Sequence, residues 1–125
     1  MRLIVFIVAA FYFALAVFMW TAPMTWYETT PGVAMMGPFN SHFVRDVALA
    51  FLMSGAAMCF GVVKLERNVT YFGLAWPCAH ALFHVWIWLT RGAPFDLVAA
   101  ANLAGIQLPA WLALFCAFSF FKKRT

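Results

Sequence analysis

The stretch LIVFIVAAFYFALAVFM, residues 3–19, decides the fold class because it contains no charged or amide side chain. A helix that crosses a bilayer needs about 20 mostly apolar residues, and this stretch lies between Arg2 and Trp20, which are typical of membrane interfaces. A secretory signal also begins with a basic residue and an apolar run, but this run is longer than a signal requires and no small-residue cleavage site follows it. We therefore expect a retained membrane helix over about residues 3–20.

Three further apolar stretches have bilayer-spanning length, and short polar segments separate them from one another. Short connections make consecutive helices antiparallel neighbours. The sequence therefore predicts an all-α, four-transmembrane-helix bundle that forms a single membrane domain over residues 1–125. The three further spans are expected at about residues 41–63, 70–89 and 97–121.

The connection between the first two spans, residues 23–40, is the longest loop of the predicted bundle. Its prolines disfavour a regular element, although a short interfacial helix around Ala34 is compatible with the sequence. Asn40 before the second span and Asp96 before the fourth are residues of the type that caps a helix N-terminus. We expect an irregular loop followed by a capped helix.

The composition excludes a soluble monomer. Hydrophobic residues make up 66% of the chain and charged residues 10%, against about 25% charged residues in an average soluble domain. The net charge of +4 does not indicate nucleic-acid binding, because the charges lie at the ends of apolar stretches rather than in a basic stripe. The cysteines all lie inside apolar stretches and predict no disulfide framework. The expected partner is the lipid bilayer.

The basic residues predict the orientation of the bundle. Most of them lie at one end of the four predicted spans, and only Arg45 and Arg91 lie at the other end. By the positive-inside rule both termini are cytoplasmic, and the loop at residues 23–40 faces outward from a bacterial inner membrane. The residues at the cytoplasmic end are Arg2, Lys64, Arg67, Lys122, Lys123 and Arg124.

Charged and titratable residues enter the second span from its outer end. His42 and Asp46 are four residues apart and share one face of a helix, whereas Arg45 points elsewhere. A carboxylate at bilayer depth is costly, so we expect Asp46 to face protein rather than lipid. One interpretation is a structural ion-pair cluster of His42, Asp46 and Arg91, and the other is a ligand-binding or proton-handling site.

The segment N-x-H-x-V-R-D, Asn40 to Asp46, resembles one that opens the second helix in small four-helix bacterial membrane proteins of unassigned function. The resemblance covers about the middle third of the chain. It implies a compact inner-membrane bundle with a polar outer entrance built on His42, Arg45 and Asp46, and it implies no activity.

His80 and His84 stand at i and i+4 on the third span, on the face that also carries Gly73 and Pro77. This spacing lets two imidazoles converge on one metal ion. His42 and Asp46 approach from the neighbouring helix, so the sequence allows a metal centre of His80, His84, His42 and Asp46. The alternative is a polar cluster in which the histidines only form hydrogen bonds between helices.

Copper is the first metal to consider, because soft thioethers suit Cu(I) and methionines gather at the outer end of the bundle. Haem is the other option, but only His42 remains to face the histidines of the third span. The outer methionines are Met19, Met24, Met35 and Met36.

In the fourth span Asn102 and Gln107 are five residues apart, so an α-helix would not place them on one face. We expect either of them to form hydrogen bonds between helices.

Three functions are compatible with the sequence. No phosphate-binding loop or nucleophile elbow is present, so the sequence does not favour an enzyme. The first function is a structural or accessory subunit, in contact with other membrane subunits or with copies of itself. The second is binding of a metal, haem or small amphiphile at the His/Asp cluster. The third is an oligomeric transporter or proton path.

Overall fold

The computed structural model describes residues 1–123, and within them every regular element is a helix. Four spans are long and apolar enough to cross a membrane, which confirms the predicted all-α bundle. The fourth span consists of α5, a π-helical turn η2, and α6. The elements are α1 (Arg2–Thr21), α2 (Pro23–Thr29), η1 (Ala34–Met36), α3 (Ser41–Lys64), α4 (Arg67–Thr90), α5 (Leu97–Asn102), η2 (Leu103–Gln107) and α6 (Leu108–Lys122).

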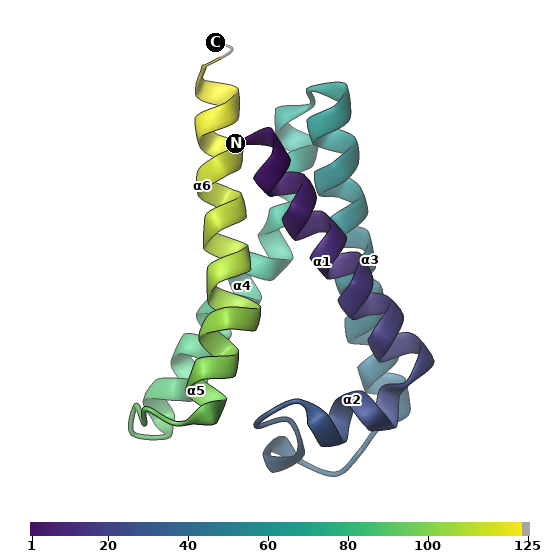
Figure 1. Ribbon diagram of the computed structural model, residues 1–125, viewed down its shortest axis with the longest axis vertical. Coiled ribbons are helices and arrows are strands. Elements are labelled where there is room, and N and C mark those ends of the chain that lie inside the picture. The colour runs from purple at the N-terminus through teal and green to yellow at the C-terminus, as the bar shows by residue number, and fades with distance from the viewer. Residues whose placement is uncertain (124–125) are drawn as a thin grey trace.

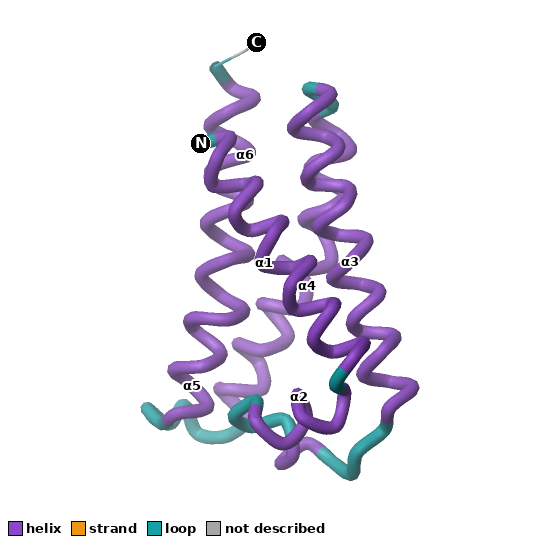
Figure 2. Tube along the Cα trace, turned by 45° about the vertical axis from the view of Figure 1, so that its right-hand side comes forward, coloured by secondary structure: helices purple, strands orange, loops and turns teal. Residues whose placement is uncertain are grey.

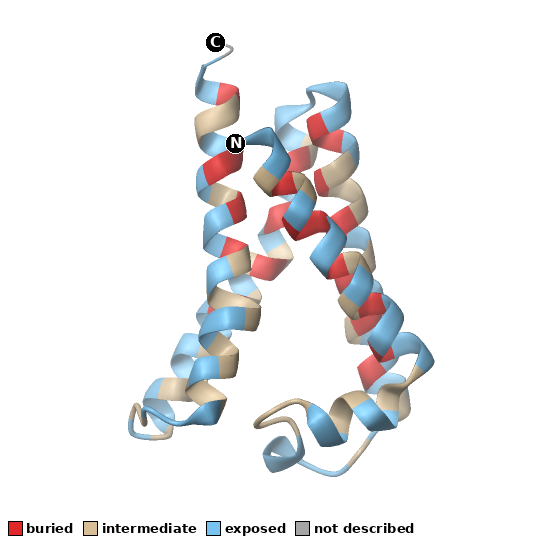
Figure 3. Ribbon diagram, viewed as in Figure 1, coloured by how far each residue is buried: buried red, intermediate tan, exposed pale blue. Residues whose placement is uncertain are grey.

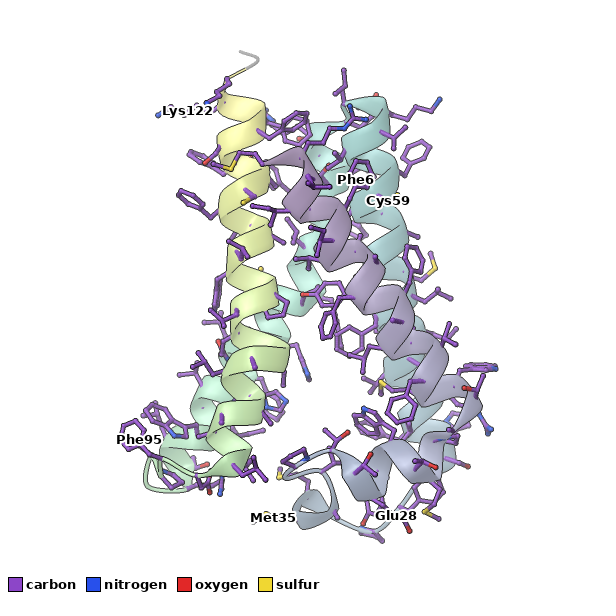
Figure 4. All side chains as sticks on the ribbon, in the orientation of Figure 1. Phe6, Glu28, Met35, Cys59, Phe95 and Lys122 are labelled. Atoms are coloured by element: carbon purple, nitrogen blue, oxygen red, sulfur yellow. The ribbon has the colours of Figure 1, made fainter. Side chains whose placement is uncertain are left out.

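The four spans run alternately up and down the bundle (Figure 1). The first span packs along α3, α3 packs along α4, and α6 contacts both α1 and α4, which closes the arrangement. The turn between α3 and α4 lies at the same end as Met1, whereas α2 and the turn between α4 and α5 lie at the opposite end (Figure 2). Figure 4 shows Glu28, Met35 and Phe95 at that opposite end, far from Lys122.

The buried residues of the fourth span lie in its second half (Figure 3). Neither α5 nor η2 contains a buried residue. Small side chains dominate the buried positions of α6, and small residues allow helix backbones to approach closely in a membrane. The fourth span therefore joins the common core only toward the end of the bundle that holds Met1. The buried residues of α6 are Ala110, Ala113, Cys116, Ala117 and Phe121.

Both expected N-caps are confirmed. The side chain of Asn40 accepts hydrogen bonds from the backbone N–H groups of His42 and Phe43 at the start of α3. Asp96 accepts a hydrogen bond from the N–H of Ala99 in α5. These bonds satisfy N–H groups that have no partner within the helix.

The prediction of an irregular loop over residues 23–40 is wrong at its start, where α2 forms a short helix. Pro23 stands at the first position of this helix, where the fixed φ of proline suits a helix and its missing N–H is not needed. The alternative that the sequence allowed, a short helix around Ala34, forms as the single 3-10 turn η1, Ala34–Met36. The loop therefore carries two short helices.

Candidate functional site

The ion pair at the start of α3 lies outside the bundle core. The Nδ1 atom of His42 is 2.9 Å from Oδ2 of Asp46, which confirms that the two residues share a helix face. Their side chains are 87% and 59% exposed, so the expectation that Asp46 faces the protein interior is wrong. The side of α3 that faces the core instead carries Val44 and Ala48. Asp46 is two residues away from each of them in the sequence, which places it on the opposite side of the helix.

Arg45 connects the start of α3 to the end of α1. Its Nε atom donates a hydrogen bond to the carbonyl oxygen of Trp20, with a distance of 3.4 Å. Its guanidinium carbon lies 5.8 Å from the centre of the Trp20 ring, which is within cation–π range. Arg45 therefore links two helices at the end of the bundle opposite Met1.

Arg91 does not join His42 and Asp46, so that part of the expected ion-pair cluster is also wrong. Its guanidinium donates to the carboxylate of Asp96 within the turn between α4 and α5. The hydrogen bond from the N–H of Ala99 and the contact with Arg91 together lower the pKa of Asp96. The indole of Trp88 donates to the carbonyl of Pro94, 2.9 Å away, and also closes this turn.

His80 and His84 form a ring pair within α4. Their ring centres are 4.5 Å apart, with an angle of 67° between the rings. Trp76 stacks on His80 at 4.8 Å with nearly parallel rings, and Phe51 of α3 meets the same imidazole edge-on at 6.0 Å. Both histidines are half-buried. The helical rise places His84 about 9 Å and His80 about 15 Å from Thr90 along the helix axis, which is within the span.

The four-residue metal centre is not assembled in this chain. Within residues 1–123 no group of three or more His, Cys, Asp and Glu side chains lies close enough to hold a metal ion. His42 and Asp46 point away from the core, whereas His80 contacts Phe51 on the inward side of α3. Two histidines alone complete no site for a metal that requires four ligands.

A hydrogen-bond network ties the fourth span to α4 beside the histidines. The amide nitrogen of Gln107 donates to the carbonyl oxygen of Ala81 at 2.8 Å and to Oδ1 of Asn102 at 3.1 Å. Asn102 donates to the carbonyl oxygen of His84 at 3.3 Å, and the indole of Trp111 donates to Oε1 of Gln107 at 2.9 Å. The network holds the backbone of α4 at the level of the two imidazoles.

The hydrogen bonds of Asn102 and Gln107 to α4 confirm that each links two helices, but the sequence did not predict that they also bond to each other. The π-helical turn η2, Leu103–Gln107, is the reason. Residues five apart fall on different faces of an α-helix, but a π-helical turn closes its hydrogen bonds from i to i+5. Asn102 and Gln107 have this spacing and hydrogen-bond to each other. Their spacing was the one signal in the sequence that could have indicated the turn. Such turns are frequent at functional sites.

The imidazole nitrogens of His80 and His84 form no hydrogen bond with any protein group in residues 1–123. In this they differ from the side-chain amides of Asn102 and Gln107 beside them. In the same described part of the chain, no side-chain nitrogen or oxygen is both sealed from the surface and without a partner. The nitrogens of His80 and His84 therefore keep some accessible surface. A neutral imidazole offers one hydrogen-bond donor and one acceptor.

The arrangement can therefore hold a molecule that forms hydrogen bonds to two adjacent imidazoles, next to aromatic rings and within the depth of a membrane. Comparison with known proteins does not extend this description: neither a protein-family model, nor a curated protein, nor a solved structure matches the chain.

Proposed function

We propose that this membrane protein binds a small molecule through the imidazoles of His80 and His84. The observation that carries the proposal is the pair of adjacent imidazoles whose nitrogens keep accessible surface and have no hydrogen-bond partner among the described residues. A polar group left unsatisfied in a hydrocarbon environment costs several kcal/mol. A bound ligand with hydrogen-bonding groups removes this cost.

The ring contacts support binding over a purely structural role for the histidines. Trp76 and Phe51 hold the His80 ring from two directions, so the imidazole is oriented before a ligand arrives. Preorganised groups lose less conformational entropy on binding. Asn102 and Gln107 meanwhile carry the hydrogen bonds between the helices, so the imidazoles are not needed for that purpose.

The test uses the chain's three histidines, because His42 is a built-in control at the exposed start of α3. The protein, labelled with ¹⁵N-histidine in lipid nanodiscs, is titrated with monolauroylglycerol and with its short-chain analogue monoacetylglycerol. We expect the imidazole ¹⁵N signals of His80 and His84 to shift, since hydrogen bonding changes their environment, while those of His42 stay constant. His80→Phe and His84→Phe assign the signals. Equal shifts of all three histidines, or no shift of His80 and His84, would contradict the proposal.

The proposed orientation has both termini in the cytoplasm of a bacterial cell, and it places His84 in the outer half of the inner membrane and His80 near the middle. We expect a reporter fused after Thr125 to be active on the cytoplasmic side and a reporter inserted at Thr30 to be active in the periplasm, because the basic residues gather at the former end. Alkaline phosphatase and a fluorescent protein report the two sides. The reverse pattern would place His84 in the inner leaflet.

An accessory role in a membrane complex is a second candidate, supported by the outer half of the fourth span. Leu97 is 72% exposed, Leu103 is 55% exposed, and neither α5 nor η2 has a buried residue. A neighbouring subunit or a second copy could cover this surface. Native mass spectrometry in mild detergent tests this function, since a monomer without bound protein would contradict it. The third function, an oligomeric transporter or proton path, remains a prediction, because the structure of a single chain does not test it.

A further inference from the structure

The two sides of the bundle separate toward the end opposite Met1. Figure 1 shows the ends of α1 and α3 on one side there, and α4 with α5 on the other. Ala81 is the last buried residue of α4, and neither α5 nor η2 contains a buried residue. At this end of the bundle α1 and α3 form a first arm, and residues 82–107 form a second arm.

The histidine pair lies where the two arms diverge. The imidazole of His80 contacts Phe51 of the first arm, with 6.0 Å between the ring centres. His84 stands three residues after buried Ala81 and seven residues after buried Pro77, so the helical period places it on the same side of α4. Both imidazoles therefore lie on the inner side of α4, in the angle between the arms.

A segment of the long loop, residues 30–36, joins the two arms at their far ends, and we call it the strap. The helix before it, α2, contacts α1 and α3, and Trp26 of α2 packs against the core. On its other side the strap touches α5, because a Cβ atom at Gly32 would lie 2.6 Å from Cγ1 of Val98. Gly32 and Val98 are both half-buried. Figure 2 shows α2 between α5 and the start of α3.

The strap is held in its conformation by bonds of its own. The hydroxyl of Tyr27 donates to the carbonyl oxygen of Gly37 at 2.7 Å, which ties together the residues before and after the strap. The ring of Tyr27 also meets that of Phe39 edge-on, with 5.5 Å between the centres. Gly32 has a φ of +88°, a conformation that glycine adopts readily and other residues do not. Glycine is therefore required at position 32 both for the backbone and for the contact with Val98.

We infer that the strap is a latch on the histidine pair: the contact between Gly32 and Val98 limits access from the end opposite Met1, and its release admits a ligand. The inference rests on the proposed function, because it concerns access to the same two imidazoles. Van der Waals contacts are individually weak, so the latch can open while each arm stays folded. The second arm keeps its own hydrogen bonds, from Arg91 to Asp96 and from Asn102 to the carbonyl of His84.

The double variant Gly32→Cys/Val98→Cys closes the latch covalently. Cβ atoms at the two positions would lie 3.5 Å apart, within the range of about 3.5–4.5 Å found in disulfides. The variant in lipid nanodiscs is treated with diethyl pyrocarbonate, which acylates imidazoles, and mass spectrometry quantifies each histidine and identifies the disulfide. We expect the disulfide to slow the modification of His80 and His84 at least about tenfold relative to the reduced protein, since it removes a minor open state. His42, with a side chain that is 87% exposed, should react equally in both forms.

A second variant, Gly32→Leu, tests the latch in the opposite direction if the disulfide does not form. Its side chain cannot fit against Val98, so we expect His80 and His84 to react at least about threefold faster, as the open state gains population. Gly92→Leu is the matched control, because Gly92 has a similar φ of +83° but a Cβ atom there would meet nothing within 4 Å. It should leave the reaction of both histidines unchanged.

The outcomes separate the latch from the proposed function, because acylation requires no bound ligand. Equal rates in the oxidised and reduced double variant, or equal effects of Gly32→Leu and Gly92→Leu, would overturn the latch even if monoacetylglycerol shifts the ¹⁵N signals of His80 and His84. If the disulfide protects both histidines but neither glycerol ester shifts their signals, the latch stands and the proposed function fails.

Discussion

Gly73→Ala is expected to lower the free energy of unfolding by about 1–3 kcal/mol, the usual effect of overpacking a tight contact. A Cβ atom at this position would lie 2.8 Å from the backbone nitrogen of Met58 and 3.0 Å from the carbonyl oxygen of Ser54. It would also lie 2.9 Å from Cβ of Ala57. Since two of these atoms belong to the backbone of α3, no side-chain rotation can relieve the contact and the two helices must separate. Unfolding in mixed micelles with sodium dodecyl sulfate, followed by circular dichroism, measures the loss.

Gly105→Ala is the matched control, because a Cβ atom at Gly105 would meet no atom within 4 Å. We expect no loss of stability there, and a small gain is reasonable because alanine favours helix over glycine by about 1 kcal/mol in an α-helix. A Gly73→Ala protein as stable as the unchanged chain would show that α3 and α4 do not approach as closely as the structure places them.

Gln107→Leu is expected to lower the free energy of unfolding by about 2 kcal/mol, because hydrogen bonds between membrane helices average about 0.6 kcal/mol and reach about 1.7 kcal/mol. The substitution removes the bonds to Ala81 and Asn102 and the bond received from Trp111. Leucine has a similar size, so the loss reports hydrogen bonding more than packing. The same unfolding measurement gives the change.

The control for Gln107→Leu is Thr21→Val, since the hydroxyl of Thr21 bonds only to the carbonyl of Val17 in its own helix. This change should alter stability by a few tenths of a kcal/mol at most. Asn102→Ala combined with Gln107→Leu should cost less than the sum of the single changes, because the two residues share one network. Additive effects, or equal losses for Gln107→Leu and Thr21→Val, would contradict the network.

The features that follow from local geometry could be predicted from the sequence. Spans of apolar residues form helices in lipid because each helix satisfies its own backbone hydrogen bonds. The side chains of Asn40 and Asp96 cap the helices that begin directly after them. The His42–Asp46 contact was predictable for the same reason, since i and i+4 residues meet on any α-helix.

The position of each polar group relative to the core could not be predicted in this way. Asp46 was expected inside the bundle because a carboxylate is costly in lipid, but the core of α3 follows Val44 and Ala48 instead. Arg91 was expected near His42, but it donates a hydrogen bond to Asp96 of the same turn instead. An ion pair within one turn loses less conformational entropy than an ion pair between two helices. The sequence alone does not show which of the available partners a charged residue will bind.

The sequence by itself determined the membrane-spanning helices, their polar turns and the neighbouring positions of His80 and His84, because these depend on hydropathy and helical period alone. Tertiary structure decided that the fourth span packs through its second half, that η2 joins Asn102 to Gln107, and that the nitrogens of the two imidazoles have no hydrogen-bond partner among the described residues. These features depend on which helix faces contact one another. Lipid is as apolar as the side chains, so close packing and interhelical hydrogen bonds, rather than the hydrophobic pattern, select those faces.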